Sequence, residues 1–294
     1  MSNLKEIRNR ISSVSSTRQI TSAMKMVSAA KLRRAQDAIL QMRPYADKLY
    51  DILKSISNSL ENEADNVFGQ ERLVNNVLIV LITSNRGLCG AFNSQAIKLA
   101  VELAKVKYAK QLAGGNVYFM AFGKKGSDFL RAGQYKLVES HNEIFDNLTF
   151  ENVAPVATEI MESFSRGQYD RIELVYNQFK NAAVQILTQE QYLPVKVDDE
   201  GDDFVGYGFD YIYEPNMEVM INELIPRSLK IQLYKALLDS HAAEFGARMT
   251  AMHKATDNAT ELIKDLRLTY NKARQASITN EILEIVGGAE ALNK

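Results

Sequence analysis

A single register of apolar residues runs through the first sixty residues of the chain. Alternating steps of three and four residues from Leu4 reach Leu60 without a change of phase. The stops on this path are Leu4, Ile7, Ile11, Val14, Arg18, Thr21, Lys25, Ser28, Leu32, Ala35, Ile39, Met42, Ala46, Leu49, Leu53, Ile56 and Leu60. This spacing is typical of a coiled-coil seam, because it keeps one stripe of a helix facing a partner helix. The pattern predicts one helix roughly 80 Å long, with a bend or local break at Pro44.

The middle of this seam changes character. Four consecutive stops are polar, namely Arg18, Thr21, Lys25 and Ser28. Over the same stretch the apolar residues Ile20, Met24 and Val27 lie one position earlier, which is about 100° around a helix. One interpretation is a polar stretch of an ordinary coiled coil. The other is that a second surface, such as another protein, covers the displaced apolar stripe.

The charge of the first helix is one-sided. Up to residue 35 its basic residues are Lys5, Arg8, Arg10, Arg18, Lys25, Lys31, Arg33 and Arg34. Glu6 is the only acid there, although the whole chain of 294 residues has a net charge of −1. Such a helix indicates an acidic partner, a nucleic acid or an anionic membrane surface, and the alternative is a solvated face.

A different period begins after residue 75. The run 77-VLIVLIT-83 is continuously apolar and rich in β-branched residues, which is typical of a strand buried on both faces. Further strands are predicted at 116–122, 171–179 and 183–193, and helices at about 93–111, 124–131 and 150–166. We also expect an exposed acidic loop at 198–203 and a last extended piece at 207–213. Alternating strands and helices predict a Rossmann-like α/β domain with a largely parallel sheet.

The helical period returns at Glu214, and Pro226 is expected to kink or punctuate it. We expect a second long helix to end at Gly287-Gly288. Its predicted seam is Met252, Ala255, Ala259, Leu262, Leu266, Thr269, Ala273, Ala276, Asn280 and Leu283. The predicted fold is therefore α/β plus a long antiparallel coiled coil, in which 1–60 pairs with 214–294 and the α/β domain at 75–213 is inserted between them.

The sequence offers little that resembles a catalytic or metal site. The turn 84-SNRGLCGAFN-93 lies between a predicted strand and a predicted helix, yet it lacks the glycine and lysine spacing of phosphate-binding loops. A cysteine nucleophile at Cys89 would need a positioned base, so a buried small cysteine in a tight turn is the better interpretation. We expect no cofactor and no metal, because the three histidines and one cysteine show no ligand spacing.

Targeting signals and membrane spans are also absent from the pattern. No run of about eighteen apolar residues is present, so the chain is not expected to span a membrane by itself. The N-terminus has no apolar signal core. The single cysteine excludes an internal disulfide and fits a reducing compartment.

Three stretches together resemble a known family. They are 18-RQITSAMKMVSAAKLRRAQ-36, 83-TSNRGLCGAFN-93 and 248-RMTAMHKATDNATELIKDLRLTYNKARQASITNEILEIVGGAEAL-292. All three are similar to the gamma subunit of the F-type ATP synthase, and the start at MSNLKEIRNRI favours the bacterial type. The resemblance implies a non-catalytic rotor shaft. In that family the paired terminal helices stand inside a hexamer of three alpha and three beta subunits, and proton flow through the membrane turns the shaft to drive ATP synthesis or hydrolysis.

The resemblance also implies partners and a location. One copy of the chain would join three alpha subunits, three beta subunits, the epsilon subunit and the membrane ring of c subunits. The complex would sit at the inner cell membrane, with this chain as a peripheral protein on the cytoplasmic side. The family's regulatory dithiol, found in the chloroplast form, is excluded here because Cys89 stands alone.

Six positions match residues that the family uses in contact and coupling rather than catalysis: Met24, Lys25, Arg248, Gln275, Thr279 and Glu284. One departure is His253, where the family often has lysine, and it is expected to weaken a contact with the hexamer. Two other functions stay open on the residues alone. One is a coiled-coil scaffold that binds nucleic acid through its basic N-terminal helix, and the other is a cysteine-dependent enzyme.

Overall fold

The computed structural model describes residues 4–58, 67–195 and 217–292. The chain divides into two compact units. The helical unit comprises Met1–Ala29 and Arg248–Lys294, and the sheet unit comprises Ala30–Ala247. The division into three domains expected from the sequence stays a prediction.

Two long helices begin and end the chain. α1 spans Leu4–Asn58 and α6 spans Met217–Leu292. Both Pro44 and Pro226 lie inside continuous helices. The helix therefore passes through Pro44 without a stop, as predicted, and a full interruption at Pro226 does not occur. The end predicted at Gly287-Gly288 is also wrong, because α6 continues to Leu292. No neighbouring atom lies within 4 Å of a Cβ at either glycine. They therefore act only as weak helix formers, at about 1 kcal/mol each, inside an exposed run rather than as a packed cap.

Between these helices the chain alternates strands and helices. The elements are β1 (Val77–Ile82), α2 (Phe92–Val106), α3 (Ala109–Ala113), β2 (Val117–Phe122), α4 (Lys124–Ala132), β3 (Leu137–Ser140), the 3-10 turn η1 (Glu143–Phe145), α5 (Phe150–Ser165), β4 (Arg171–Phe179) and β5 (Gln185–Leu193). The predicted strands and helices are all present. Three elements were missed: the short strand β3, the 3-10 turn η1, and α3, which the prediction had joined to α2. The expected features at 198–203 and 207–213 lie outside the described residues.

The sheet has the strand order β3-β2-β1-β4-β5. β1, β2, β3 and β4 run parallel, and β5 lies antiparallel at the edge beside β4. This confirms the largely parallel sheet of a Rossmann-like fold. β1 is the central strand, and all six of its side chains are fully buried.

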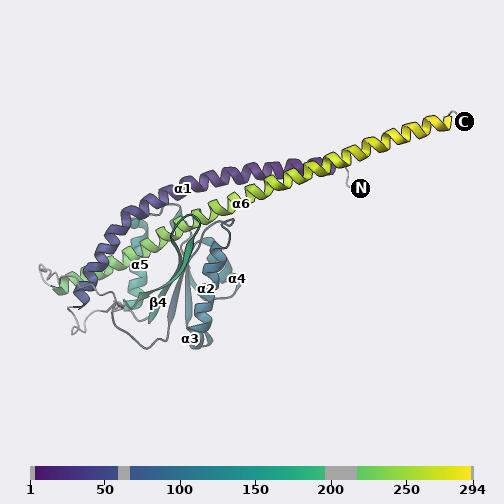
Figure 1. Cartoon of the computed structure of the whole chain (residues 1–294). Coiled ribbons are helices and arrows are strands. Elements are labelled where there is room, and N and C mark those ends of the chain that lie inside the picture. The colour runs from purple at the N-terminus through teal and green to yellow at the C-terminus, as the bar shows by residue number, and fades with distance from the viewer. Residues whose placement is uncertain (1–3, 59–66, 196–216, 293–294) are drawn as a thin grey trace. The chain divides into compact units, whose positions relative to one another are not determined.

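The side chains of β1 alternate between two hydrophobic clusters. Leu78, Val80 and Ile82 point into a cluster with α5 and the part of α6 that belongs to the sheet unit. The residues between them point into a cluster with α2 and α4 on the opposite face. Figure 1 shows these helices on the two sides of the sheet. The period of two along β1 thus explains why an uninterrupted apolar run was needed: both faces of the strand are covered.

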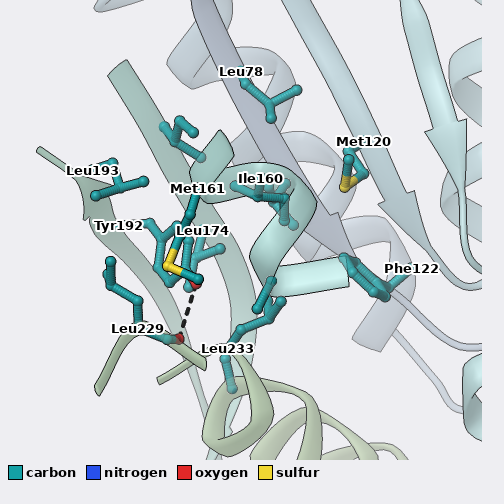
Figure 2. Close-up of a cluster of buried hydrophobic side chains, with 14 of the residues drawn as sticks. Leu78, Met120, Phe122, Ile160, Met161, Leu174, Tyr192, Leu193, Leu229 and Leu233 are labelled. Atoms are coloured by element: carbon teal, nitrogen blue, oxygen red, sulfur yellow. Dashed lines mark hydrogen bonds between the residues drawn. The ribbon is translucent and has the colours of Figure 1, made fainter. Parts of the chain in front are cut away.

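The first cluster also fixes α6 to the sheet. Leu229 and Leu233 of α6 belong to the same cluster as Tyr192 and Leu193 of β5, and Figure 2 shows Tyr192 directed toward Leu229. The Tyr192 hydroxyl donates a hydrogen bond of 2.9 Å to the Leu229 carbonyl oxygen. Apolar contact and a buried hydrogen bond together anchor this part of α6.

Candidate partner-contact surface

The helical unit is built from one antiparallel pair of helices. The Arg8 guanidinium donates to the Tyr270 hydroxyl at 2.9 Å, and the Thr256 hydroxyl donates to the Thr21 hydroxyl at 2.9 Å. Residue numbers therefore rise along α1 while they fall along α6, which confirms the predicted antiparallel pairing. The hydrogen bond from Arg8 also lowers the pKa of Tyr270, because it favours the phenolate.

The seam predicted on α1 matches the face that the structure buries. Every stop from Leu4 to Ser28 is buried or half-buried in the helical unit. In the sheet unit the same register continues through Leu32, Ala35, Ile39 and Leu49, all of which are at most 6% exposed. The side chains of Leu53, Ile56 and Leu60 lie outside the described residues.

The seam predicted on α6 is correct at Met252, Ala255, Ala259, Leu266 and Ala273 and wrong at the other five stops. Leu262 is 39% exposed, whereas its neighbour Ile263 is only 6% exposed. Beyond Ala259 the less exposed side chains are those of Ile263, Leu266, Tyr270, Ala273 and Ser277. The steps of three and four alternate in the opposite order from the one predicted, so Thr269, Ala276, Asn280 and Leu283 are exposed.

Two of the four polar stops in the middle of the seam are hydroxyl residues, and both make hydrogen bonds there. The Ser28 hydroxyl donates to the Met24 carbonyl oxygen at 2.7 Å. The Thr21 hydroxyl donates to the Arg18 carbonyl oxygen at 3.0 Å and accepts the hydrogen bond from Thr256. These groups satisfy one another locally, so no unpaired polar atom is needed inside the pair. Thr256 was not predicted to be part of the seam, although it directly follows the predicted stop Ala255.

An apolar stripe faces away from the helix pair, as its displacement by one position predicts. Ile20 is 60% exposed and Val27 is 58% exposed, while Met24 between them is half-buried. Lys5, Arg8 and Arg10 on the same helix are exposed. The surface of α1 in this unit is therefore apolar on one side and basic along much of its length, and such a surface suits a protein partner.

The first three of the six predicted contact residues lie in the middle of the chain's two long helices. Met24 and Lys25 are half-buried on α1, and Arg248 on α6 is 7% exposed. The register set by Thr21 and Thr256 brings Arg248 to within about one helical turn of the position opposite Lys25. The structure thus brings these three together.

The other three lie apart from them. Gln275, Thr279 and Glu284 are exposed further along α6, roughly 40 to 54 Å along the helix from Arg248. The Thr279 hydroxyl donates to the Gln275 carbonyl oxygen at 3.0 Å. From Ile278 to Ala289 every side chain is exposed, and Figure 1 shows this end of α6 continuing alone beyond the start of α1.

The turn after β1 has the structure expected of a buried cysteine. Cys89 is 2% exposed, and the Asn93 amide donates to its sulfur at 3.2 Å. Leu88 adopts a left-handed backbone with φ of 65°. Over the described ranges, no cluster of three or more histidine, cysteine or acidic side chains has the arrangement to hold a metal ion. Within the same ranges, no helix has both the length and the apolarity required to cross a membrane.

The chain is similar to known proteins over essentially its whole length. The ATP synthase family model matches residues 3–292. An ATP synthase gamma chain of Flavobacterium johnsoniae is 60% identical, and the alignment covers 100% of both chains. Those of Christiangramia forsetii and Cytophaga hutchinsonii are 56% and 52% identical, again over 100% of each chain.

Solved structures share the fold at lower identity. A chain of the Euglena gracilis mitochondrial ATP synthase, from a structure of its OSCP, F1 and c-ring in one rotational state, aligns with a TM-score of 0.68 and 24% identity. That alignment covers 98% of this chain and 94% of the other. A chain of the rotor of the same enzyme aligns with a TM-score of 0.61 and 21% identity.

Proposed function

We infer the role of this chain from one premise, which is that it belongs to the family of ATP synthase gamma chains. It is a non-catalytic subunit of a membrane-associated complex. Its function is that of the central rotor shaft, which couples proton flow across the membrane to ATP synthesis or hydrolysis in the alpha and beta subunits. The observation that carries this conclusion is 60% identity to a gamma chain over the full length of both proteins.

The helical unit has the asymmetry that such a shaft requires. A partner shifts a conformational equilibrium only if it contacts the two states differently. The helix pair presents the apolar stripe of Ile20 and Val27 on one side and other chemistry elsewhere. Three equivalent catalytic subunits around this shaft would each meet a different surface at any moment. Rotation would then bring the same surface to each of them in turn.

The partners follow from this role. We propose that one copy of the chain assembles with three alpha and three beta subunits, and that the sheet unit lies near the epsilon subunit and the c-ring. The exposed basic residues Lys5 and Arg10 would face acidic loops of the beta subunits. We further propose that the chain is a peripheral protein on the cytoplasmic side of the inner cell membrane.

The six contact residues are proposed to work as two groups. Met24, Lys25 and Arg248 would meet the hexamer at one level of the shaft. Gln275, Thr279 and Glu284 would meet it at a second level, where α6 continues alone. Their separation along α6 supports two levels, since residues at least about 40 Å apart along a helix cannot serve one contact. The alternative function of a nucleic-acid-binding scaffold has no support from the relatives, which are gamma chains.

Reassembly tests the proposed function. Purified alpha and beta subunits would be assayed for ATP hydrolysis with and without this chain. We expect one copy of the chain to join three alpha–beta pairs and to raise turnover well above that of the pairs alone. If the chain neither joins the pairs nor changes their turnover, the proposed function is wrong.

A further inference from the structure

The two long helices are attached to the sheet unit in different ways. α6 contributes Leu229 and Leu233 (Figure 2), and also Leu237, to the large hydrophobic cluster on one face of the sheet. None of the described members of that cluster lies on α1. The core therefore fixes α6 directly to the sheet, whereas α1 depends on other contacts for its position.

One side chain of α1 reaches both α6 and the sheet. Nη2 of Arg43 lies 3.6 Å from Oδ1 of Asp239 on α6. The same nitrogen donates a hydrogen bond of 3.3 Å to the carbonyl oxygen of Phe179, the last residue of β4. A single nitrogen of Arg43 on α1 thus contacts both α6 and β4, so this side chain bridges three elements of the sheet unit.

Two further contacts join α1 to α6 in this unit. The Arg227 guanidinium lies over the Tyr45 ring at 5.7 Å, and the Lys31 ammonium lies over the Phe245 ring at 5.3 Å. These pairs connect one helix to the other. Arg43 differs from them because it also holds the end of a strand.

Burying the carboxylate of Asp239 at this position costs folding free energy. Its side chain is 0% exposed, and neither carboxylate oxygen has a hydrogen-bond partner within the part of the chain that the structure describes. Burial raises the pKa of Asp239, against the opposing effect of Arg43 and Lys235, and Glu190 raises it further. Glu190 itself accepts a hydrogen bond of 3.0 Å from the Tyr176 hydroxyl.

Stability alone does not explain this carboxylate. Replacing a buried ion pair by well-packed apolar residues is often neutral or stabilising, because the desolvation of the charges exceeds their attraction. An uncharged residue at position 239 would cost less to bury. A buried pair that costs folding free energy points to a role in holding a specific arrangement.

We propose that Arg43 is the clasp that locks α1 to α6 and to β4, and that it is a positioning residue for the transmission of torque. This rests on the proposed function as a rotor shaft. The chain passes between its two units twice, once within α1 and once within α6. Torque delivered to the sheet unit therefore leaves it through these two helices. With the clasp in place both helices turn with the sheet. Without it α1 keeps its buried apolar seam and its cation–π contacts with α6 but loses its direct link to β4, so its position is less firmly fixed.

The test uses the full complex in membrane vesicles, with ATP hydrolysis and ATP-driven proton uptake measured on the same sample. Asp239→Asn removes the buried charge without changing the shape of the side chain. We expect it to keep the thermal stability of the chain and the rate of hydrolysis, while protons moved per ATP fall about two-fold or more. Arg43→Ala is expected to lower the same ratio at least as much.

Two more variants make the test specific. Lys48→Ala removes an exposed charge from the same helix and should leave protons per ATP unchanged. Arg43→Lys keeps one charged nitrogen that can serve both acceptors, as Nη2 does, so its ratio should recover above that of Arg43→Ala. A ratio in Arg43→Lys no higher than in Arg43→Ala would overturn the bridge, and full coupling in Asp239→Asn would overturn the clasp even if Arg43→Ala fails to fold.

Failure of the clasp and failure of the proposed function give different experimental results. If the unsubstituted chain fails to join the alpha and beta subunits or to stimulate hydrolysis, the shaft function itself is wrong. If the unsubstituted chain couples normally and the Asp239 and Arg43 variants do too, only the clasp is wrong.

Discussion

The sheet unit and the helical unit obtain their stability in different ways. In the sheet unit, the side chains of the central strand β1 are fully buried between two hydrophobic clusters. In the helical unit, two of the most buried positions on α1 are hydroxyl residues, Ser28 at 2% and Thr21 at 9% exposure. The sheet unit therefore holds its structure by its own core. The helical unit leaves apolar surface uncovered, which is a cost that binding inside a larger assembly removes.

The largest expected effect is the loss of a core aromatic ring from the sheet unit. Phe164 on α5 is 0% exposed and belongs to the cluster shared with α6. Phe164→Ala should lower the free energy of unfolding by about 4 kcal/mol, because it removes buried area and leaves a cavity. Urea unfolding of the isolated chain measures this. The matched control is Phe129→Ala on α4, where the ring is 43% exposed, and equal losses in both variants would contradict a stability centred on the core.

Alkaline pH should change the stability of the two units in opposite directions. Burial raises the pKa of Tyr108, Tyr176 and Tyr192 in the sheet unit, with Glu173 and Glu190 adding to the effect at the first two. Above the ordinary tyrosine pKa of about 10, the unfolded chain loses protons that the folded sheet unit keeps. The stability of the sheet unit is therefore complete below that pH and falls as the pH rises beyond it.

The contribution of Tyr270 to the stability of the helical unit changes with pH in the opposite direction. Its pKa is lowered, so the contribution of its contact with Arg8 is present above pH about 10 and is lost as pH falls through the lowered value. Urea unfolding between neutral pH and pH 11 should show a shallower alkaline loss in Tyr192→Phe than in the unsubstituted chain. Tyr270→Phe should not make that loss shallower. A steeper alkaline loss in Tyr192→Phe would contradict the assignment of the effect to the buried phenols.

A smaller effect is expected from the seam of the helical unit. Ile263 is 6% exposed there, yet it contacts a thin interface rather than a closed core. Ile263→Ala should cost about 1 kcal/mol locally, below the range typical of core truncations. Hydrogen exchange should quicken in the helical unit while the sheet unit is unchanged. Leu268→Ala, at a position 62% exposed, is the control and should change neither.

The smallest effect on stability, and the sharpest on function, is expected at Met24. Met24→Lys adds a charge beside Ile20 and Val27 on a surface that is already basic. The isolated chain should unfold as before, while protons moved per ATP fall about two-fold, because the contact with the hexamer is disturbed. Met26→Lys, two residues away on a different side of α1 and 66% exposed, should keep normal coupling. Equal losses in both variants would mean that position on the helix does not matter.

The seam on α1 could be predicted because its spacing leaves one choice of face at each stop. On α6 the spacing left two choices, since Leu262 and Ile263 are adjacent and both apolar. Only the packing against α1 selects Ile263, and that information is not local. β3 was missed for a related reason: its four residues are short of apolar side chains, and it is recognised as a strand only by pairing with β2.

The candidate contact surface also has features that could be predicted from the sequence and features that could not. The displacement of Ile20 and Val27 by one position predicted that they would be exposed, and they are. The roles of Arg248, Gln275 and Glu284 came from the family resemblance, because exposure or burial on a helix does not by itself identify a partner. The bridge between Arg43 and Asp239 had no sequence signal, since its residues lie nearly 200 positions apart and meet only in the folded chain.

Rotation of the chain inside its hexamer tests the central claim most directly. With the alpha and beta subunits fixed to a surface and a visible probe attached to the sheet unit, ATP should drive the probe in one direction. Three equivalent catalytic subunits predict three equal steps per turn. If ATP is hydrolysed at full rate while the probe stays still or moves without direction, the chain is not the shaft of this motor.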